Sequence, residues 1–196
     1  MNEVTVFIRS MRFLGTQIVS YPMLWQIRQF WPGCRLRVVA QDDVGRHYLS
    51  LPWVDEFIQA DTFMENYRAL GRRTDMMIVL HFASDKYGAV AMLRRPRARL
   101  GFRNGRLTDF IWTHAHRKDF SEYMGLANMR LLAAYRQFDP EGCARSSMQA
   151  LAELRETTPD PADIVFMPGG GAGDYKRWPI ESYVALADLL RERFGS

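Results

Sequence analysis

The stretch VTVFIRSMRFLGTQIVSYPMLWQIRQFWPGCRLRVVA, residues 4–40, contains a complete strand–helix–strand unit. β-Branched and aromatic residues predict a strand at 4–9, and RLRVVA predicts a second strand at 35–40. Between them, apolar residues recur at near-helical spacing over about 17–30, and the Pro-Gly pair of WPGC ends that helix. A helix that joins two strands in this way predicts a parallel sheet with helices on its faces.

The same alternation of strands and helices continues along the chain. We expect strands at 54–60, 75–81 and 98–102, and helices at 43–51, 62–70, 84–95 and 119–138. A linker with one helix is expected at 141–162, after a first domain at 1–140, and Pro140, Pro159 and Pro161 mark it. The predicted fold is therefore α/β, with a Rossmann-like parallel sheet.

After the linker the strand–helix rhythm restarts. DIVFMP predicts a strand, a glycine loop follows it, and a helix is expected at 181–194. One strand and one helix cannot bury their own apolar faces. We therefore expect residues 163–196 either to pack on the first domain or to open a second, incomplete α/β domain.

The composition describes a folded protein with a mild excess of positive charge. Of the 196 residues 47% are hydrophobic, the net charge is +4 and the pI is near 9.3. This charge favours an anionic partner, such as a phosphorylated small molecule, an anionic membrane surface or nucleic acid. The two cysteines, Cys34 and Cys143, have no metal-ligand spacing. The N-terminus lacks a signal-peptide core, and we expect a cytoplasmic protein.

The loop PGGGAGDYKRWP, residues 168–179, has the features of a phosphate-binding turn. Glycines let backbone N–H groups approach an anion closely, and the N-terminus of the following helix favours negative charge. Lys176 and Arg177 precede that helix and are placed to neutralise a diphosphate. The loop matches neither the P-loop nor the dinucleotide fingerprint. The alternative is a surface connection with a solvated Lys-Arg pair.

The first turn, after the strand at 4–9, repeats this arrangement of strand, glycine and helix. Ligands of open α/β sheets bind beyond the carboxyl ends of the strands. A substrate is therefore expected near Arg9, Arg12, Gly15 and Thr16. The alternative is an ordinary strand–helix turn with two solvated arginines.

Four stretches together resemble the heptosyltransferases of lipopolysaccharide core synthesis, glycosyltransferase family 9. They are the first turn, the Pro-x-Leu at 22–24, LRRPRARLGFRNG at 93–105, and PGGGAGDYKRWPIESYVALADLL, in which KRWP is the most specific part. The resemblance implies the GT-B fold, two Rossmann-like domains that face a cleft. It also implies inverting transfer of a sugar from a nucleotide sugar such as ADP-heptose, without a metal or further cofactor. The acceptor would be a phosphorylated glycolipid at the inner face of the inner membrane.

The resemblance assigns roles to individual residues. Donor diphosphate would be bound by Gly169, Gly170, Gly171, Lys176 and Arg177. The expected acceptor contacts come from position and not from the resemblance. They are Arg9, Arg12 and Gly15 after the first strand, and Lys86 and Arg99 from the basic stretch and the segment just before it.

The first turn departs from the family pattern. The family usually has Gly-Asp there, and its Asp is the general base, whereas this chain has Gly15-Thr16. A threonine hydroxyl does not accept a proton at neutral pH as a carboxylate does. Asp42 and Asp85 follow strands at the same predicted edge, with helix capping as the alternative role; Asp85 is the second candidate base.

This departure, with the short chain, leaves two other hypotheses. One is a non-catalytic protein that binds an anionic glycan or a partner. The other is a fragment whose C-terminal half is lost or supplied by a separate chain.

Arginines crowd the stretch LRRPRARLGFRNGR at 93–106. They predict a patch for a phosphorylated acceptor or an anionic membrane surface, and a solvated helix end is the alternative. Nucleic acid is not expected, since no binding motif accompanies the charge. His114 and His116 are expected in a surface loop, and no metal site is expected.

Overall fold

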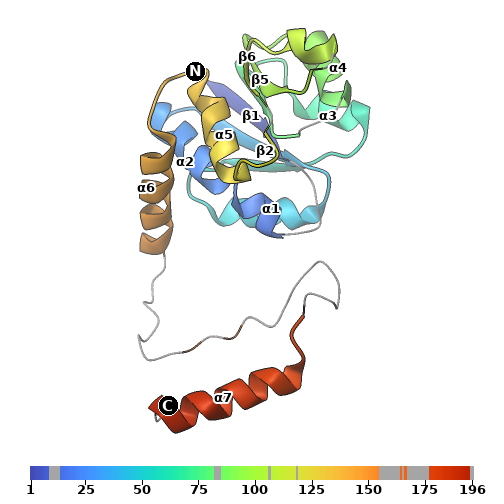
Figure 1. Cartoon of the computed structure of the whole chain (residues 1–196). Helices are drawn as coiled ribbons and strands as arrows, with labels where there is room; N and C mark the ends of the chain where they lie inside the picture. Colours follow the sequence, from blue (N-terminus) through green and yellow to red (C-terminus); the bar gives the residue numbers. More distant parts are fainter. Residues whose placement is uncertain are drawn as a thin grey trace. The chain divides into compact units, whose positions relative to one another are not determined.

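The computed structural model describes residues 1–8, 14–81, 85–105, 107–117, 119–154, 164, 166 and 177–194. Contacts within the chain divide it into two compact units, Met1–Ala152 and Glu153–Ser196 (Figure 1). The domain boundaries expected from the sequence, at residues 140 and 162, stay predictions.

The first unit is built on one six-stranded parallel sheet. Its strands are β1 (Glu3–Phe7), β2 (Arg35–Ala40), β3 (Glu56–Gln59), β4 (Met76–Val79), β5 (Ala98–Arg103) and β6 (His114–Arg117). Their order across the sheet is β3-β2-β1-β4-β5-β6, which is the order of the Rossmann fold. The predicted α/β class with a parallel sheet is confirmed.

Strand sequences explain why both faces of this sheet are covered. Side chains alternate between the two faces of a strand, and both sets are apolar in the central strands. In register across the sheet, Val38, Val6, Ile78 and Leu100 form one buried row on the first face. Phe7 with its neighbours on β2 and β4 belongs to a second core on the other face.

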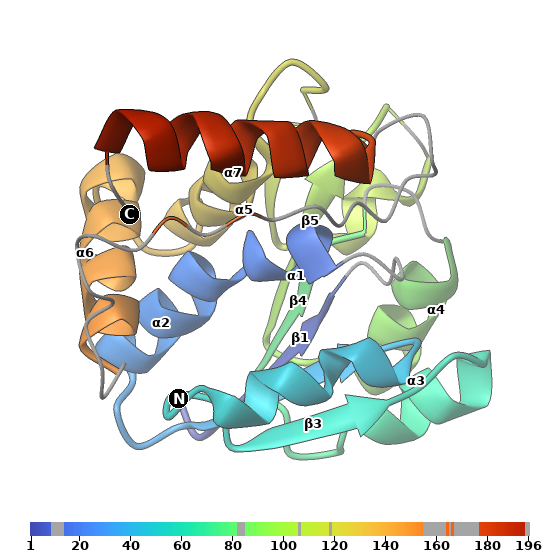
Figure 2. The ribbon, with the colours of Figure 1, turned by 90° about the horizontal axis from the view of Figure 1, so that it is seen from below.

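Helices cover both faces of the sheet (Figure 2). They are α1 (Leu14–Ile18), α2 (Tyr21–Phe30), η1 (Asp43–Ser50), α3 (Phe63–Ala69), α4 (Asp85–Arg94), η2 (Leu107–Ile111), α5 (Met124–Ala133) and α6 (Pro140–Glu153). Helices α2 and α5 contribute Met23, Leu24 and Leu131 to the first core. Helices α3 and α4 contribute Ala69 and Val90 to the second core.

The helix expected over about 17–30 is two helices, α1 and α2. Pro22 stands in the first turn of α2 and has no N–H, so it cannot continue the hydrogen bonds of α1. The Ser20 hydroxyl instead donates to the carbonyl of Gln17 at 2.7 Å and fixes the junction.

The prediction of a surface loop at His114 and His116 was wrong, because both lie in β6. This strand pairs with β5 in parallel, Leu100 beside His114 and Phe102 beside His116. Its sequence, HAHR, has only one apolar residue. A polar sequence is tolerated there because β6 is an edge strand and its side chains are partly exposed. The helix expected from residue 119 accordingly begins later, at Met124.

In the second unit, the expected helix at 181–194 is confirmed as α7 (Ile180–Phe194). The rings of Phe166 and Trp178 contact the ring of Tyr183, with centroids 5.8 and 5.2 Å away. None of the residues of α7 is buried, and Val184 is 58% exposed. The expected strand at 163–168 and the glycine loop lie outside the described residues, apart from single positions.

Candidate functional site

The candidate site is the carboxyl edge of the sheet between β1 and β4. These strands are neighbours, and the strand order reverses there, because the chain runs outward to β3 on one side and to β6 on the other. The segments that follow β1 and β4 lead into α1 and α4 at this edge. The fold thereby brings Gly15 of α1 to the same edge as Asp85 and Lys86 of α4.

His81 lies directly beyond β4 and links the two central strands. Its Nε2 is 3.0 Å from the carbonyl oxygen of Ile8 and 3.1 Å from the hydroxyl of Tyr87. The carbonyl of Ile8 can only accept, so Nε2 carries the hydrogen in this contact. The two rings also pack, with centroids 4.6 Å apart. Burial raises the pKa of Tyr87, which keeps its hydroxyl protonated.

Lys86 connects α4 to the segment after β3. Its Nζ donates to the carbonyl of Asp61 at 2.5 Å and lies 5.1 Å from the ring centroid of Tyr87. The carboxylate of Asp61 in turn accepts from the amide of Gln41 at 2.7 Å. The ends of β2 and β3 and the first turn of α4 are thus joined by polar contacts.

Asp42 is the carboxylate at this edge with an unmet hydrogen-bonding capacity. It stands at the N-cap position of η1, but its side chain makes no capping hydrogen bond. Its Oδ1 is buried and has no hydrogen-bond partner among the described residues. Buried carboxylate oxygens are normally satisfied, so Oδ1 of Asp42 keeps an unused acceptor capacity at this edge. Asp85 is exposed in the first turn of α4.

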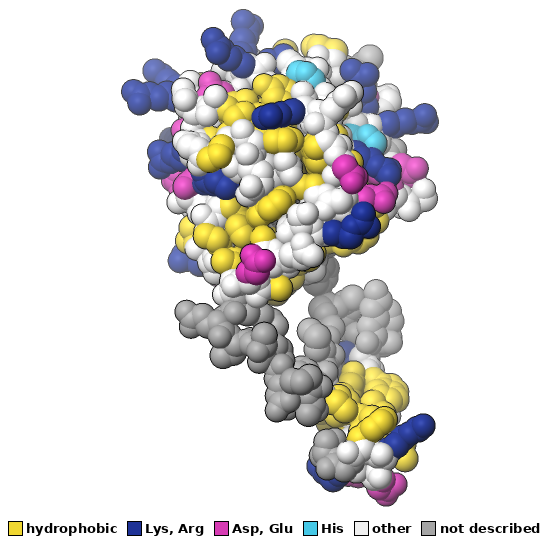
Figure 3. Space-filling model, turned by 90° about the vertical axis from the view of Figure 1, so that its left-hand side faces the viewer, with side chains coloured by type: hydrophobic (Ala, Val, Ile, Leu, Met, Phe, Trp, Pro, Cys, Tyr) yellow, Lys and Arg dark blue, Asp and Glu magenta, His cyan; other side chains and the backbone are white. Residues whose placement is uncertain are grey.

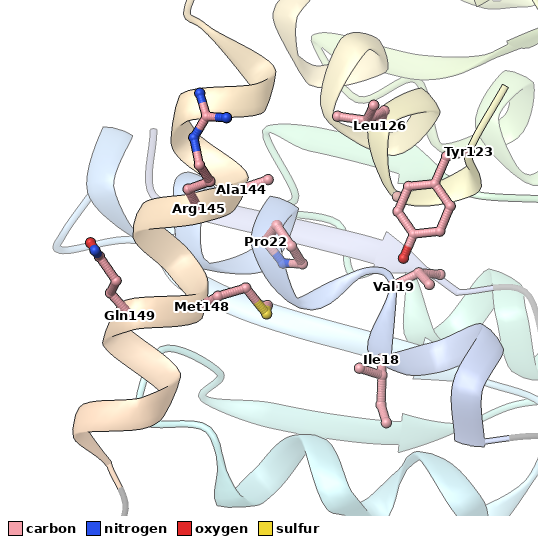
Figure 4. A pocket seen from close by; sticks show the side chains of 10 residues that line it. Ile18, Val19, Pro22, Tyr123, Leu126, Ala144, Arg145, Met148 and Gln149 are labelled. Carbon is pink, nitrogen blue, oxygen red and sulfur yellow. The ribbon is translucent and has the colours of Figure 1, made fainter.

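An apolar pocket adjoins α1. Its volume is about 520 Å³, and it lies between the α1–α2 junction, the start of α5 and one side of α6 (Figure 4). Ile18, Leu126 and Met148 point into it, with Arg145 at its border. Apolar side chains also gather over the surface on the side of α2 and α6 (Figure 3). This pocket could not be predicted from the sequence, because its lining comes from segments more than a hundred residues apart.

A second hollow, of about 630 Å³, lies at the end of β6. His116 and Arg130 both contact the carboxylate of Glu122, His116 through Nε2 at 2.9 Å. The exposed ring of Phe120 also lines it. A polar cluster beside an exposed ring suits a polyhydroxylated ligand, but its residues are already paired with one another.

The other predicted site residues are distributed as follows. Arg99 lies near the amino end of β5, where its guanidinium donates to the carbonyls of Ile111 and Pro96 at 2.8 and 2.9 Å. Gly15 is exposed, and a Cβ there would meet nothing within 4 Å, so no steric constraint requires a glycine. Arg177 is exposed in the second unit. Arg9, Arg12, Gly169, Gly170, Gly171, Lys176 and the side chain of Thr16 lie outside the described residues.

The described residues hold neither a metal-binding cluster nor a candidate membrane span. Within this part of the chain no group of three or more His, Cys, Asp or Glu side chains is arranged to hold a metal ion. None of the described helices has the length and apolar character needed to cross a membrane.

Several solved glycosyltransferase structures share this fold. A glycosyl transferase family 9 structure from Veillonella parvula matches with a TM-score of 0.67 at 19% identity, over 97% of this chain and 60% of that one. ADP-heptose lipopolysaccharide heptosyltransferase II from E. coli matches with a TM-score of 0.64 at 18% identity, over 97% and 62%. The E. coli heptosyltransferase WaaC with ADP matches with a TM-score of 0.64 at 15% identity, over 97% and 65%.

These matches establish the fold, a Rossmann-like α/β arrangement shared with GT-B glycosyltransferases. The chain spans less than two thirds of the length of each of these three structures. No protein-family model matches the sequence, and no curated protein matches it significantly.

Proposed function

We propose that this chain is the acceptor-side part of a glycosyltransferase that takes a sugar from a nucleotide sugar. The observation that carries the proposal is the six-stranded sheet, of order β3-β2-β1-β4-β5-β6. Its fold matches solved glycosyltransferase structures over 97% of this chain. Fold alone does not define an activity, so the proposal also rests on the chemistry of the carboxyl edge and of the KRWP stretch.

An ADP-sugar of the heptose type is the proposed donor. Two of the similar E. coli structures contain ADP or ADP-2-deoxy-2-fluoro heptose. In this chain the glycines at 169–171 would supply N–H groups to the diphosphate, and Lys176 and Arg177 would neutralise the charge that develops on the leaving group. The nucleotide sugar is a substrate, and we propose no further cofactor.

The proposed acceptor is a phosphorylated glycolipid of the lipopolysaccharide core type, met at the inner face of the inner membrane. Its reacting hydroxyl would lie at the edge between β1 and β4, beside Gly15 and Lys86. The apolar pocket next to α1 would accommodate a hydrocarbon part of such a molecule, because its lining is mainly apolar.

A general base is needed to take the proton of that hydroxyl. Thr16, at the position where the similar family has its Asp, does not supply one. Asp42 and Asp85 are the candidate bases at this edge, and the unpartnered Oδ1 of Asp42 favours the former. The Asp42→Asn variant should then lose transfer while Asp85→Asn keeps it.

The test is to incubate the protein with ADP-heptose and a range of core acceptors. ADP release together with the mass of one heptose added to an acceptor is the expected result. Lys176→Ala should abolish it, and Arg191→Ala, a change of equal charge on exposed α7, should not. If no acceptor gives ADP release or gains the mass of a heptose, the proposal is wrong.

A non-catalytic role is the second candidate, and the Gly15-Thr16 pair favours it. Such a protein would bind an anionic glycan and leave a donor intact. Calorimetry with the same acceptors distinguishes the two roles: binding without ADP release supports the second, and no heat with any acceptor argues against it.

A further inference from the structure

Six arginines line one hollow at the amino edge of the sheet, opposite the candidate site. The hollow has a volume of about 610 Å³ and is formed by the amino ends of β1 and β2 and by the segments that precede β4 and β5. Its arginines are Arg35, Arg72, Arg73, Arg94, Arg95 and Arg97, and its other lining residues are Asn2, Glu3, Thr74, Asp75 and Pro96. We call it the arginine hollow. Half of its arginines come from the turn before β4 and from β2, so the basic stretch at 93–106 does not account for it alone.

The two carboxylates of the hollow are already engaged. Glu3 accepts from Arg37, a buried arginine beneath the hollow, at 2.6 Å and from the hydroxyl of Thr74 at 2.6 Å. Asp75 accepts the backbone N–H of Asn2 at 2.6 Å. The positive charge of the six arginines is therefore only partly compensated by the protein.

Two of the arginines are held in place without an ion pair. The Nε of Arg94 donates to the carbonyl of Tyr67 at 3.0 Å, and its guanidinium lies 3.7 Å from the centre of that ring. Arg95 follows α4 with a φ of 50°, where glycine is the residue of least cost, and it is the one non-glycine residue with positive φ in the described part of the chain. The fold thus keeps an arginine at this position against a backbone cost.

Two more arginines are exposed and available. Arg72 and Arg73 occupy the turn between α3 and β4, and neither has a hydrogen-bond or ion-pair partner within the described residues. Arg35, by contrast, forms an ion pair with Glu56 at 2.9 Å.

We propose that the arginine hollow binds a ligand with at least two neighbouring phosphoryl groups. Planar guanidinium groups bind phosphate oxygens through paired hydrogen bonds, and a cluster of them favours a multiply charged group over a single carboxylate. The hollow has no exposed aromatic ring on which a nucleic acid base would stack. Two sources supply this chemistry, a free diphosphate compound and the headgroups of an anionic lipid surface. The site is separate from the carboxyl edge and does not depend on glycosyl transfer there.

The experiment has two arms. In the first, pyrophosphate is titrated into the protein and the heat is measured. In the second, the protein is sedimented with vesicles of phosphatidylcholine alone or with added phosphatidylglycerol. Both arms use the wild type, the pair Arg72→Ala/Arg73→Ala, and the control pair Arg191→Ala/Arg193→Ala, which removes the same charge from exposed α7. A third pair, Arg72→Lys/Arg73→Lys, keeps the charge and removes the paired hydrogen bonds.

We expect the Arg72/Arg73 alanine pair to weaken binding about tenfold or more in at least one arm, with the control pair near the wild type. Loss in the pyrophosphate arm identifies a free diphosphate ligand, and loss confined to anionic vesicles identifies a lipid surface. The lysine pair should fall between alanine and wild type. Equal affinities for the Arg72/Arg73 pair and the control pair in both arms would overturn the proposal, as would no binding by the wild type in either arm. Unchanged circular dichroism and melting temperature verify that the variants are folded.

Discussion

Arg37 of β2 is one of nine buried polar or charged residues described in the chain, and its partner explains why it is tolerated. Its guanidinium contacts Glu3 of β1 and the hydroxyls of Thr5 and Thr74, which ties β1 and β2 to the turn before β4. A buried ion pair is not itself strong evidence of stabilisation, yet the loss of one partner leaves the other charge buried and uncompensated.

Replacing Arg37 by methionine is therefore expected to lower the free energy of unfolding by about 3 kcal/mol. Arg35→Met is the matched control on the same strand, because the side chain of Arg35 is 59% exposed. Its surface pair with Glu56 should contribute about 0.5 kcal/mol or less. Urea denaturation of both variants checks this, and equal midpoints would contradict the account of Arg37.

Asp75 provides a prediction with a defined pH dependence. The N–H of Asn2 is the main cause that lowers the pKa of Asp75 below its ordinary value of 3.8. A carboxylate with a lowered folded pKa contributes stability that is present above the unfolded value and is lost as the pH falls through the folded one. Asp75→Asn should thus destabilise the protein near neutral pH, and the difference from wild type should shrink at about pH 3. Urea midpoints at the two pH values measure it, and a constant difference would speak against the assignment.

Among the elements, η1 shows how a short helix is held against the sheet. The hydroxyl of Tyr48 donates to the carbonyl of Gln17 at 3.0 Å, and the ring of Phe57 from β3 packs on Gly45. A Cβ on Gly45 would overlap that ring, whereas a Cβ on Gly33 would meet no atom within 4 Å. Glycine at 45 is thus a packing requirement and not a flexible joint.

Gly45→Ala is expected to cost about 1–3 kcal/mol of stability, because the Phe57 ring or η1 must move. Gly33→Ala, at an open position with ordinary backbone, should change stability by about 0.5 kcal/mol or less. Thermal unfolding of the two variants tests this. Similar melting temperatures would mean that the ring of Phe57 moves at little cost.

Elements that carry a strong local pattern could be predicted from the sequence, and the others could not. The strands RLRVVA and ARLGF each carry a continuous buried apolar row on one face, and their positions were predicted within a residue. The strand at His114–Arg117 has no such run, because its place at the sheet edge follows from pairing with β5 and not from its own side chains. The break between α1 and α2 follows from Pro22, which has no N–H and cannot continue the hydrogen bonds of the preceding turn. Helical spacing of apolar residues alone did not predict it.

Site prediction was limited for a different reason. Residues that follow strands β1 and β4 could be assigned to one edge, since a parallel sheet places all carboxyl ends together. The apolar pocket and the arginine hollow combine segments that are distant in sequence, so no local sequence pattern predicts them. The role of Arg99 likewise could not be predicted from its position in a strand, because its two carbonyl partners come from the loop before β5 and from the end of η2.

At the scale of the whole molecule, the sheet separates two regions of different chemistry. The carboxyl edge carries Lys86 and His81, and the amino edge carries the arginine hollow. If both proposals hold, ligands at the two edges should respond to different variants. Lys86→Ala should weaken binding of a core glycan acceptor and leave pyrophosphate affinity unchanged, whereas Arg72→Ala/Arg73→Ala should do the reverse. Calorimetry of each ligand with each variant provides the four measurements. A variant at one edge that weakens both ligands equally would mean that one site, and not two, binds the phosphoryl groups.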